Sequence, residues 1–281
     1  MRIALVSDIH ANLAALEAVM LHVESSAPDQ VLVGGDTINR GPQPHACLQA
    51  IRSRVRDHGW KVIRGNHEDY VLRVASGIDH LPEWERKVMS HTVWTEALVR
   101  DDLEEIAAWP SELEVAAPDG STIVLTHASR KGNRVGIYAS MTDEVIIDHA
   151  HPHAGVFCVG HTHIPFIRRI GERLFVNSGA VGMPFDGDHR ASYALLEWSA
   201  DGWSAEIVRV PYDRMATARA FDETGYREHG GPMVPIIYWE FQHARPALGL
   251  WHQRFEKDVS EGRITLEDSV RMMIENPQAA L

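Results

Sequence analysis

Metal-binding residue types follow a series of short apolar segments along this sequence. The segments are IALVS (3–7), VLVGG (31–35), KVIR (61–64), TIVLT (122–126) and VFCVG (156–160). The residues that come after them are Asp8 and His10, Asp36, Asn66 and His67, His127, and His161 with His163. Carboxylate, amide and imidazole groups are ligands for divalent cations. The sequence therefore predicts a metal site built at the ends of successive strands.

This donor set suits two metal ions better than one. Two aspartates, one asparagine and four histidines can hold two divalent cations with one aspartate between them. Two ions about 3.5–4 Å apart polarise a phosphoryl group and lower the pKa of a shared water. Because the set has no thiolate, we expect two divalent ions per chain from among Mn, Fe, Zn and Ni, with Mn or Fe favoured. The two cysteines, Cys47 and Cys158, lie in apolar segments and are expected to be buried and unpaired.

The apolar segments must be strands for these residues to converge. Helix-like stretches at 12–23 and 44–55 separate the first three segments, which predicts a β-α-β-α-β unit with a parallel sheet. The carboxyl ends of parallel strands open on the same edge of a sheet, so the residues that follow them should meet there. Glycines at 34, 35, 65 and 160 are expected to let the backbone turn just before these residues.

The rest of the chain divides into further predicted parts. A polar, helical stretch after residue 69 indicates an insertion over 69–120, a strand is expected at 173–177, and 191–210 is typical of a hairpin with its turn at Asp201-Gly202. We expect a main domain over 1–211 and a C-terminal helical extension over 212–281. The aromatic residues of that extension, Trp239 and Trp251 among them, form internal packing, a homo-oligomer interface or a lid over a ligand.

Composition limits the classes of partner. The chain has 27 basic and 39 acidic residues and a formal net charge of −12, without a cluster of lysine and arginine. This argues against non-specific binding of nucleic acid or of an anionic membrane. A nucleotide or another small phosphate ester remains compatible, because bound metal ions reverse the local field. No apolar run of about 18 residues is present, so we expect a soluble, cytoplasmic protein.

The motifs in their order resemble a known family. The sequence contains DIH, VGGDTINRGP, IRGNHEDY, VGHTHIP and VNSGAVGMPFDGD. Together they resemble the calcineurin-like metallophosphoesterases, and they are most similar to the compact bacterial branch of that family. The resemblance covers about residues 1–210. It implies an α/β fold, a four-layer α/β/β/α sandwich of two mixed sheets, of which the pattern of segments predicts only the parallel half.

The resemblance also implies roles for individual residues. One metal would be held by Asp8, His10, Asp36 and His163, and the other by Asp36, Asn66, His127 and His161. His67 would be the catalytic histidine, with Asn66 beside it, and Arg40 could clamp a phosphate. The implied activity is hydrolysis of phosphate mono- or diesters, in which a metal-bound hydroxide attacks the phosphorus.

The sequence departs from the family pattern at two places. In the protein-phosphatase branch an aspartate orients the catalytic histidine, and here that position is Asn39, which can orient an imidazole but cannot support its positive charge. The histidine at 127 usually precedes glycine, and here it precedes Ala128 and the basic pair Arg130 and Lys131. We expect one of these two basic residues to contribute to substrate choice.

Two alternatives stay open at this point. The first is a non-catalytic, metal-binding scaffold on the same fold, although such a protein would be expected to lose the catalytic histidine or several ligands. The second is that His149, His151 and His153 also bind a metal. These three come before the strand at 156–160, whereas His161 and His163 follow it. We therefore expect the first three to lie in a solvated loop at the opposite edge of the sheet, away from the metals.

Overall fold

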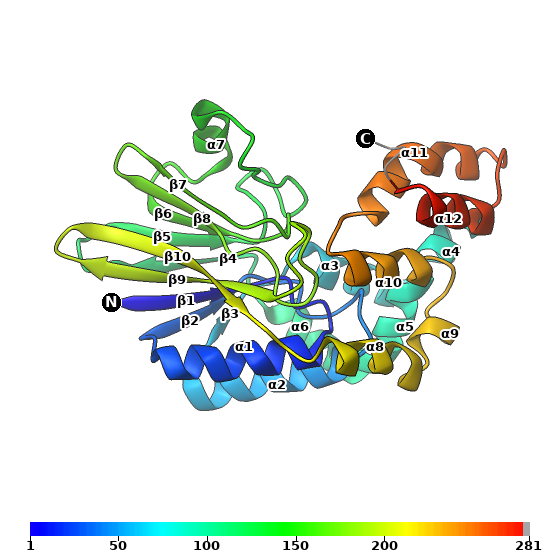
Figure 1. The fold of residues 1–281 in the computed structure, drawn as a ribbon, viewed down its shortest axis with the longest axis horizontal. Helices are drawn as coiled ribbons and strands as arrows, with labels where there is room; N and C mark the ends of the chain where they lie inside the picture. The colour runs from blue at the N-terminus through cyan, green and yellow to red at the C-terminus, as the bar shows by residue number, and fades with distance from the viewer. Residues whose placement is uncertain (278–281) are drawn as a thin grey trace.

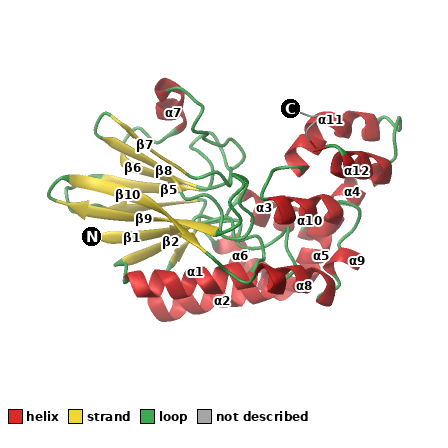
Figure 2. Cartoon of the chain, in the orientation of Figure 1, coloured by secondary structure: helices red, strands yellow, loops and turns green. Residues whose placement is uncertain are grey.

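The computed structural model describes residues 1–277, and the last four residues of the predicted extension, 278–281, lie outside this part. Two five-stranded mixed sheets pack against each other (Figures 1 and 2). The first has the order β10 (Gly202–Val210), β9 (Ala191–Ser199), β1 (Arg2–Val6), β2 (Gln30–Val33) and β3 (Lys61–Val62). The second has the order β4 (Glu112–Ala116), β5 (Thr122–Thr126), β6 (Ala154–Val159), β8 (Arg173–Asn177) and β7 (Phe166–Ile170).

The predicted parallel unit is confirmed. Strands β1, β2 and β3 are parallel, and α1 (Leu13–Ser26) and α2 (Pro44–His58) connect them. The hairpin of β9 and β10 is also confirmed, with its turn between Ser199 and Gly202, and β9 pairs antiparallel with β1. Strands β4 and β7 were not predicted. Both lie at edges of the second sheet and carry polar residues, so they lack the continuous apolar pattern of a buried strand.

Apolar side chains pack between the four layers of the predicted sandwich. In β1, Ile3 and Leu5 face the second sheet, while Ala4 and Val6 face α1 and α2. This alternation buries both faces of β1. On the outer face of the second sheet, Phe157 packs with α7 (Asp143–His149). The fold is therefore the α/β/β/α sandwich that the sequence resemblance implies.

The remaining helices gather near the carboxyl ends of β1, β2 and β6 (Figure 1). The segment after β3 contains α3 (Asn66–Ala75), α4 (Glu83–Val88), α5 (Ser90–Val99), a short 3-10 turn (Arg100–Asp102) and α6 (Leu103–Ala108). The segment after β10 contains α8 (Arg214–Glu223), α9 (Tyr226–His229), α10 (Val234–His243), α11 (Leu248–Ser260) and α12 (Leu266–Glu275). Trp251 is fully buried among these C-terminal helices, so of the three roles predicted for the aromatic residues it has that of internal packing. No helix in residues 1–277 is long and apolar enough to cross a membrane.

Candidate metal centre and substrate cavity

The loops that follow β1, β2 and β6 are joined by hydrogen bonds. The Asp8 amide donates to the Gly35 carbonyl (3.1 Å), and the His10 amide donates to the Asp36 carbonyl (2.9 Å). The His161 amide donates to the carboxylate of Asp8 (3.0 Å), which ties the second sheet to the first. These bonds bring residues more than 150 positions apart in the sequence to one edge of the sandwich, as the strand pattern predicts.

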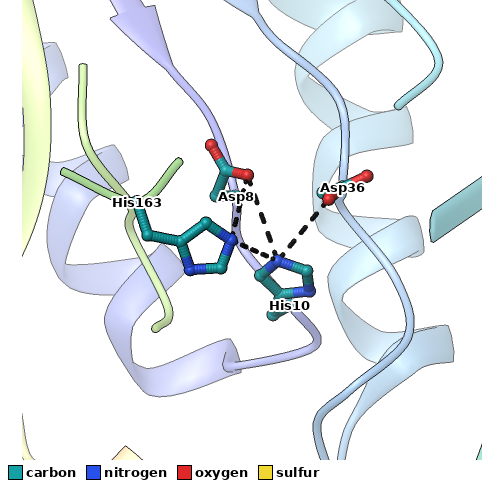
Figure 3. A group of neighbouring side chains, drawn as sticks. All are labelled: Asp8, His10, Asp36 and His163. Carbon is teal, nitrogen blue, oxygen red and sulfur yellow. Dashed lines mark hydrogen bonds and ion pairs between the residues drawn. The ribbon is translucent and has the colours of Figure 1, made fainter. Parts of the chain in front are cut away.

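The first group of donors is compact. Asp8, His10, Asp36 and His163 are all buried, and one candidate ligand atom from each lies within 4.8 Å of the others (Figure 3). The Nε2 atoms of His10 and His163 are 3.0 Å apart. Nε2 of His163 is 3.3 Å from Oδ1 of Asp8, and Nε2 of His10 is 3.6 Å from Oδ2 of Asp36.

A second group adjoins the first through Asp36. Nε2 of His127 is 3.3 Å from Oδ2 of Asp36 and 2.9 Å from Oδ1 of Asn66. Oδ1 of Asn66 is also 2.9 Å from Nδ1 of His161. The structure therefore brings all seven sequence-predicted ligands to one edge of the sandwich.

The orientation of three of the four imidazoles suits cation binding. Nδ1 of His10, His127 and His163 faces a backbone carbonyl, of Asn39 (3.2 Å), Gly34 (2.8 Å) and Met183 (2.6 Å) respectively. A carbonyl only accepts, so each Nδ1 must carry a proton and each Nε2 presents a lone pair when the ring is neutral. Those lone pairs point at one another and at the carboxylates. Bound cations remove this repulsion, and backbone carbonyls often orient metal-binding histidines in this way.

One carboxylate oxygen of Asp36 lies between a histidine of the first group and a histidine of the second. Its Oδ1 accepts a hydrogen bond from the His67 amide (2.9 Å), and its Oδ2 faces His10 on one side and His127 on the other. Burial raises the pKa of Asp36, but His127 and His67 outweigh burial and hold that pKa well below its usual range. Burial lowers the pKa of His127, but the facing Asp36 carboxylate raises it to about 10. In the absence of a metal, the proton on Nε2 of His127 would therefore occupy the position that a cation would take.

The backbone around this centre has unusual conformations. Seven candidate site residues have φ between 47° and 71°, in the left-handed region: Asp8, His10, Asp36, Asn39, Arg40, His161 and His163. Aspartate, asparagine and histidine tolerate this region better than most residues do. Such conformations persist where the surrounding structure holds them, and they concentrate at functional sites.

Two of the four glycines serve a purpose that the sequence did not indicate. Gly35 has φ of +89°, as a sharp turn requires, but Gly65 and Gly160 do not have positive φ. A Cβ at Gly65 would lie 2.2 Å from Oδ1 of Asp36, and a Cβ at Gly160 would lie 2.4 Å from Oδ2 of Asp8. Of the four predicted turn glycines, Gly35 alone has a positive φ; Gly34 lacks it too, and Gly65 and Gly160 instead provide room for the carboxylates.

His67 lies beside the two groups and is oriented by Asn39. Oδ1 of Asn39 accepts hydrogen bonds from the Arg40 amide (2.9 Å) and from the Thr95 hydroxyl (3.2 Å). The Asn39 amide nitrogen must therefore face Nδ1 of His67, at 3.1 Å, and donate to it. Burial lowers the pKa of His67, and Arg40 adds to this effect against the opposing charge of Asp36. The imidazole is thus neutral, with its proton on Nε2.

Arg40 is held by a residue that sequence analysis did not single out. Its guanidinium forms a buried ion pair with Glu240 of α10. The other oxygen of Glu240 accepts from the backbone amides of Ala247 and Leu248, both at 2.8 Å, at the start of α11. Nε of Arg40 is buried and has no hydrogen-bond partner within the described chain. One donor of Arg40 is therefore committed to Glu240, and Nε is left without a partner.

Glu68 is a second buried acid that sequence analysis did not assign. Its carboxylate accepts hydrogen bonds from four backbone amides, those of Gly65, Asp36, Thr37 and Ile38. Burial and the nearby Asp36 raise the pKa of Glu68 to about 7. Glu68 is the third residue of α3 and bonds the amide just before this helix, a pattern that marks helix starts and could have identified its role.

A cavity of about 400 Å³ opens beside His67. Arg40, Asn66, His67 and His161 line it on the side of the metal centre. The other walls come from α3, α4, α5, α11 and the loop after β5; they include Tyr70, Arg73, Glu85, Arg134, His252 and Glu256. The donors that would contact a phosphate therefore share one cavity with side chains of the C-terminal helices.

Other predicted residues lie away from this cavity. His151 and His153 face Glu112 (3.1 Å) and Glu114 (2.8 Å) of the edge strand β4, and His149 bonds within α7. Arg130 and Lys131 both pair with Asp148, at 3.0 and 2.6 Å, and neither lines the cavity. The basic residue of this loop that does line it is Arg134, which sequence analysis did not single out.

Comparison with known proteins identifies the family of this chain. The sequence model of the calcineurin-like phosphoesterase superfamily domain matches residues 1–201, and the chain belongs to that family. An uncharacterized protein of Methanocaldococcus jannaschii is 27% identical over 227 residues, which cover 75% of this chain and 88% of that protein. Phosphodiesterase YfcE of Escherichia coli is 24% identical over 203 residues, with 70% of this chain and 88% of that protein covered.

Two solved structures share the fold over most of the chain. A metallophosphoesterase from Sphaerobacter thermophilus is 25% identical, with 87% of this chain and 99% of that chain covered and a TM-score of 0.65. A hypothetical protein from Pyrococcus horikoshii is 18% identical, with coverages of 82% and 98% and a TM-score of 0.68. These matches cover more than residues 1–201, so they include part of the C-terminal helices.

Proposed function

We propose that this protein hydrolyses small phosphate mono- or diesters with the help of two divalent cations. The observation that carries the proposal is the arrangement around Oδ2 of Asp36, which faces a histidine of each ligand set. The first cation would bind Asp8, His10, Asp36 and His163, and the second would bind Asp36, Asn66, His127 and His161. This nitrogen and oxygen set favours Mn or Fe and also admits Zn or Ni.

When bound, the two ions would polarise the phosphoryl group and lower the pKa of a water molecule so that it can attack phosphorus. The chain's own residues do the rest. Arg40 presents its free donors to a phosphoryl oxygen, where a guanidinium binds in a fixed geometry. His67 presents its Nε2 proton to the cavity and stabilises negative charge as it forms on the phosphate oxygens or the leaving oxygen. Asn66, which precedes His67 in the chain, belongs to the second ligand set and also lines the cavity.

Two further observations support hydrolysis of a small ester. The cavity of about 400 Å³ has the volume of sites for small ligands. One relative, phosphodiesterase YfcE, is named for the cleavage of diesters. A scaffold without activity has no need of His67, and this chain holds His67 in a defined orientation at the cavity.

The test uses the purified chain loaded separately with Mn, Fe, Zn or Ni. We expect cleavage of p-nitrophenyl phosphate, of its bis ester, or of both. His67→Ala should lose turnover and keep its metal content, whereas Asp36→Asn should lose both. His153→Ala serves as the control, because His153 is an exposed histidine that faces Glu114 far from the cavity. Normal metal content without cleavage of either ester, together with a stable protein partner, would instead support a scaffold.

A further inference from the structure

The loop between β5 and α7 brings Arg134 to the cavity. Asn133 donates a hydrogen bond to Asp69 of α3, which fixes the loop on one side of Arg134. On the other side Gly136 packs so closely on the strand exit of β6 that a Cβ there would lie 2.7 Å from Cγ2 of Thr162 and 3.2 Å from Cδ2 of His161. These contacts place Arg134 between α3 and a candidate metal ligand.

The side chain of Arg134 lies over an aromatic ring. Its guanidinium carbon is 4.5 Å from the ring centroid of Tyr70, and Tyr70 in turn contacts His67 edge to face, with centroids 5.3 Å apart. An arginine over a tyrosine ring is attracted by the ring and keeps its N–H donors in the guanidinium plane available. Tyr70 thus limits the mobility of an exposed arginine without occupying its donors.

Arg134 is also the guanidinium of the cavity whose charge has no acidic partner in residues 1–277. Three arginines line the cavity, and the other two are paired, Arg40 with Glu240 and Arg73 with Glu85 (3.1 Å). The remaining acid in the lining, Glu256, faces His252 at 3.4 Å. Arg134 is therefore the arginine of the cavity lining that forms no ion pair within residues 1–277.

We propose that Arg134 and Tyr70 form a binding site for a second anionic group, a phosphate or carboxylate, carried by the leaving portion of the substrate. This assignment rests on the proposed function, because it takes the metal centre as the place where the first phosphate is cleaved. The guanidinium fork binds either anion with two parallel hydrogen bonds. Residues of α11, Leu248 and His252 among them, also line this cavity of about 400 Å³, so the favoured substrate is a small, doubly anionic phosphate ester.

The experiment compares phenyl phosphate with its 3-carboxy and 4-carboxy derivatives, which add an anionic group to the leaving portion. The measured quantity is kcat/KM of each carboxylated ester divided by kcat/KM of phenyl phosphate, which removes effects common to all three. Arg134→Gln should lower this ratio about tenfold for at least one derivative, as expected for loss of a charge-assisted pair. Arg130→Gln, which removes a nearby arginine that pairs with Asp148 outside the cavity, should leave the ratio at the wild-type value.

An unchanged ratio in Arg134→Gln for both derivatives would overturn the proposal, and so would an equal change in Arg130→Gln. The binding of phenylphosphonate and its carboxylated analogues, measured by calorimetry on the metal-loaded chain, separates this result from a failure of the proposed function. These analogues cannot be hydrolysed, so a preference for the carboxylated compounds that Arg134→Gln removes supports the binding site even if no ester is cleaved. Equal affinity of wild type and Arg134→Gln for them would refute it.

Discussion

At the scale of single residues, Asn39 determines what His67 can do. The amide of Asn39 donates to Nδ1 of His67, since its oxygen is already engaged by Arg40 and Thr95. A neutral imidazole with its proton on Nε2 stabilises developing charge as a hydrogen-bond donor. It is a poor general acid, because loss of that proton would leave an anionic ring. In the proposed reaction the leaving group would therefore depart largely without a proton from His67.

This role predicts the effect of Asn39→Asp. A carboxylate accepts a hydrogen bond from a protonated Nδ1 and supports a positively charged imidazole, while its oxygens can still accept from Arg40 and Thr95. We expect the variant to gain activity on aryl phosphates with poor leaving groups relative to those with good ones. The measurement is the slope of log kcat/KM against leaving-group pKa, which should be shallower in Asn39→Asp. Asn39→Ala is the control, and the same slope in wild type and Asn39→Asp would contradict this account of His67.

At the scale of elements, β6 separates two sets of histidines. His161 and His163 follow its carboxyl end and enter the metal centre, while His151 and His153 precede it and face β4. Such a division follows from strand direction, so it could be predicted from the sequence. Five histidines within fifteen residues thus include only two candidate ligands.

The triple variant His149→Ala, His151→Ala, His153→Ala tests this division. We expect it to bind the same amount of metal as wild type, because none of the three side chains approaches the two ligand sets. The measurement is metal content by elemental analysis after gel filtration. His161→Ala with His163→Ala is the matched comparison and should lower the content. Loss of metal from the triple variant would show that the strand or the site has been misplaced.

Helices α10 and α11 are connected to the metal centre through Glu240. This carboxylate is 1% exposed and holds both Arg40 and the first amides of α11. We expect Glu240→Ala to lower the free energy of unfolding by about 3–5 kcal/mol, because it leaves the Arg40 charge buried without its partner. Glu240→Gln should cost less, since its amide oxygen can still accept from Ala247 and Leu248. Urea denaturation of both variants measures the difference.

The control for Glu240 is an exposed ion pair at the C-terminal end of α11. Asp258 pairs with Arg263, and both side chains are about half exposed. Asp258→Ala should change the free energy of unfolding by less than about 1 kcal/mol, because water screens exposed pairs. A loss in Glu240→Ala no larger than that of Asp258→Ala would mean that the buried pair does not connect the helices to the site.

At the scale of the whole molecule, metal binding should stabilise the fold. The candidate ligands come from loops of both sheets, so cations that bind them favour the folded chain over the unfolded one. At a free metal concentration about 100 times Kd this amounts to about 2.7 kcal/mol, and in a chain of this size we expect removal of metal with EDTA to lower Tm by about 5 °C or more. Asp36→Asn should show a much smaller effect of EDTA. Equal melting temperatures of the wild type with and without metal would contradict this coupling.

Some residues of the candidate site could be predicted from the sequence and others could not, for a physical reason. Residues at the ends of buried strands could be placed at one edge because parallel strands have a fixed direction, and the family resemblance then implied the two ligand sets and the role of His67. Glu240, Tyr70 and Arg134 could not be placed. They come from helices and a loop whose positions depend on how apolar side chains pack across the molecule, such as Trp251 within the C-terminal helices. The metal-binding residues could therefore be predicted from the sequence, whereas the residues that shape the cavity could not.

The left-handed backbone at Asp8, His10, Asp36, His161 and His163 has a consequence for the order of folding. A short peptide with any one of these motifs would leave that conformation, since non-glycine residues disfavour it unless their surroundings impose it. Here the surroundings are the hydrogen bonds between loops of the two sheets. Metal capture should thus be a late event in folding, and the nascent chain would have no competent centre until β6, which is followed by His161 and His163, has joined the sandwich.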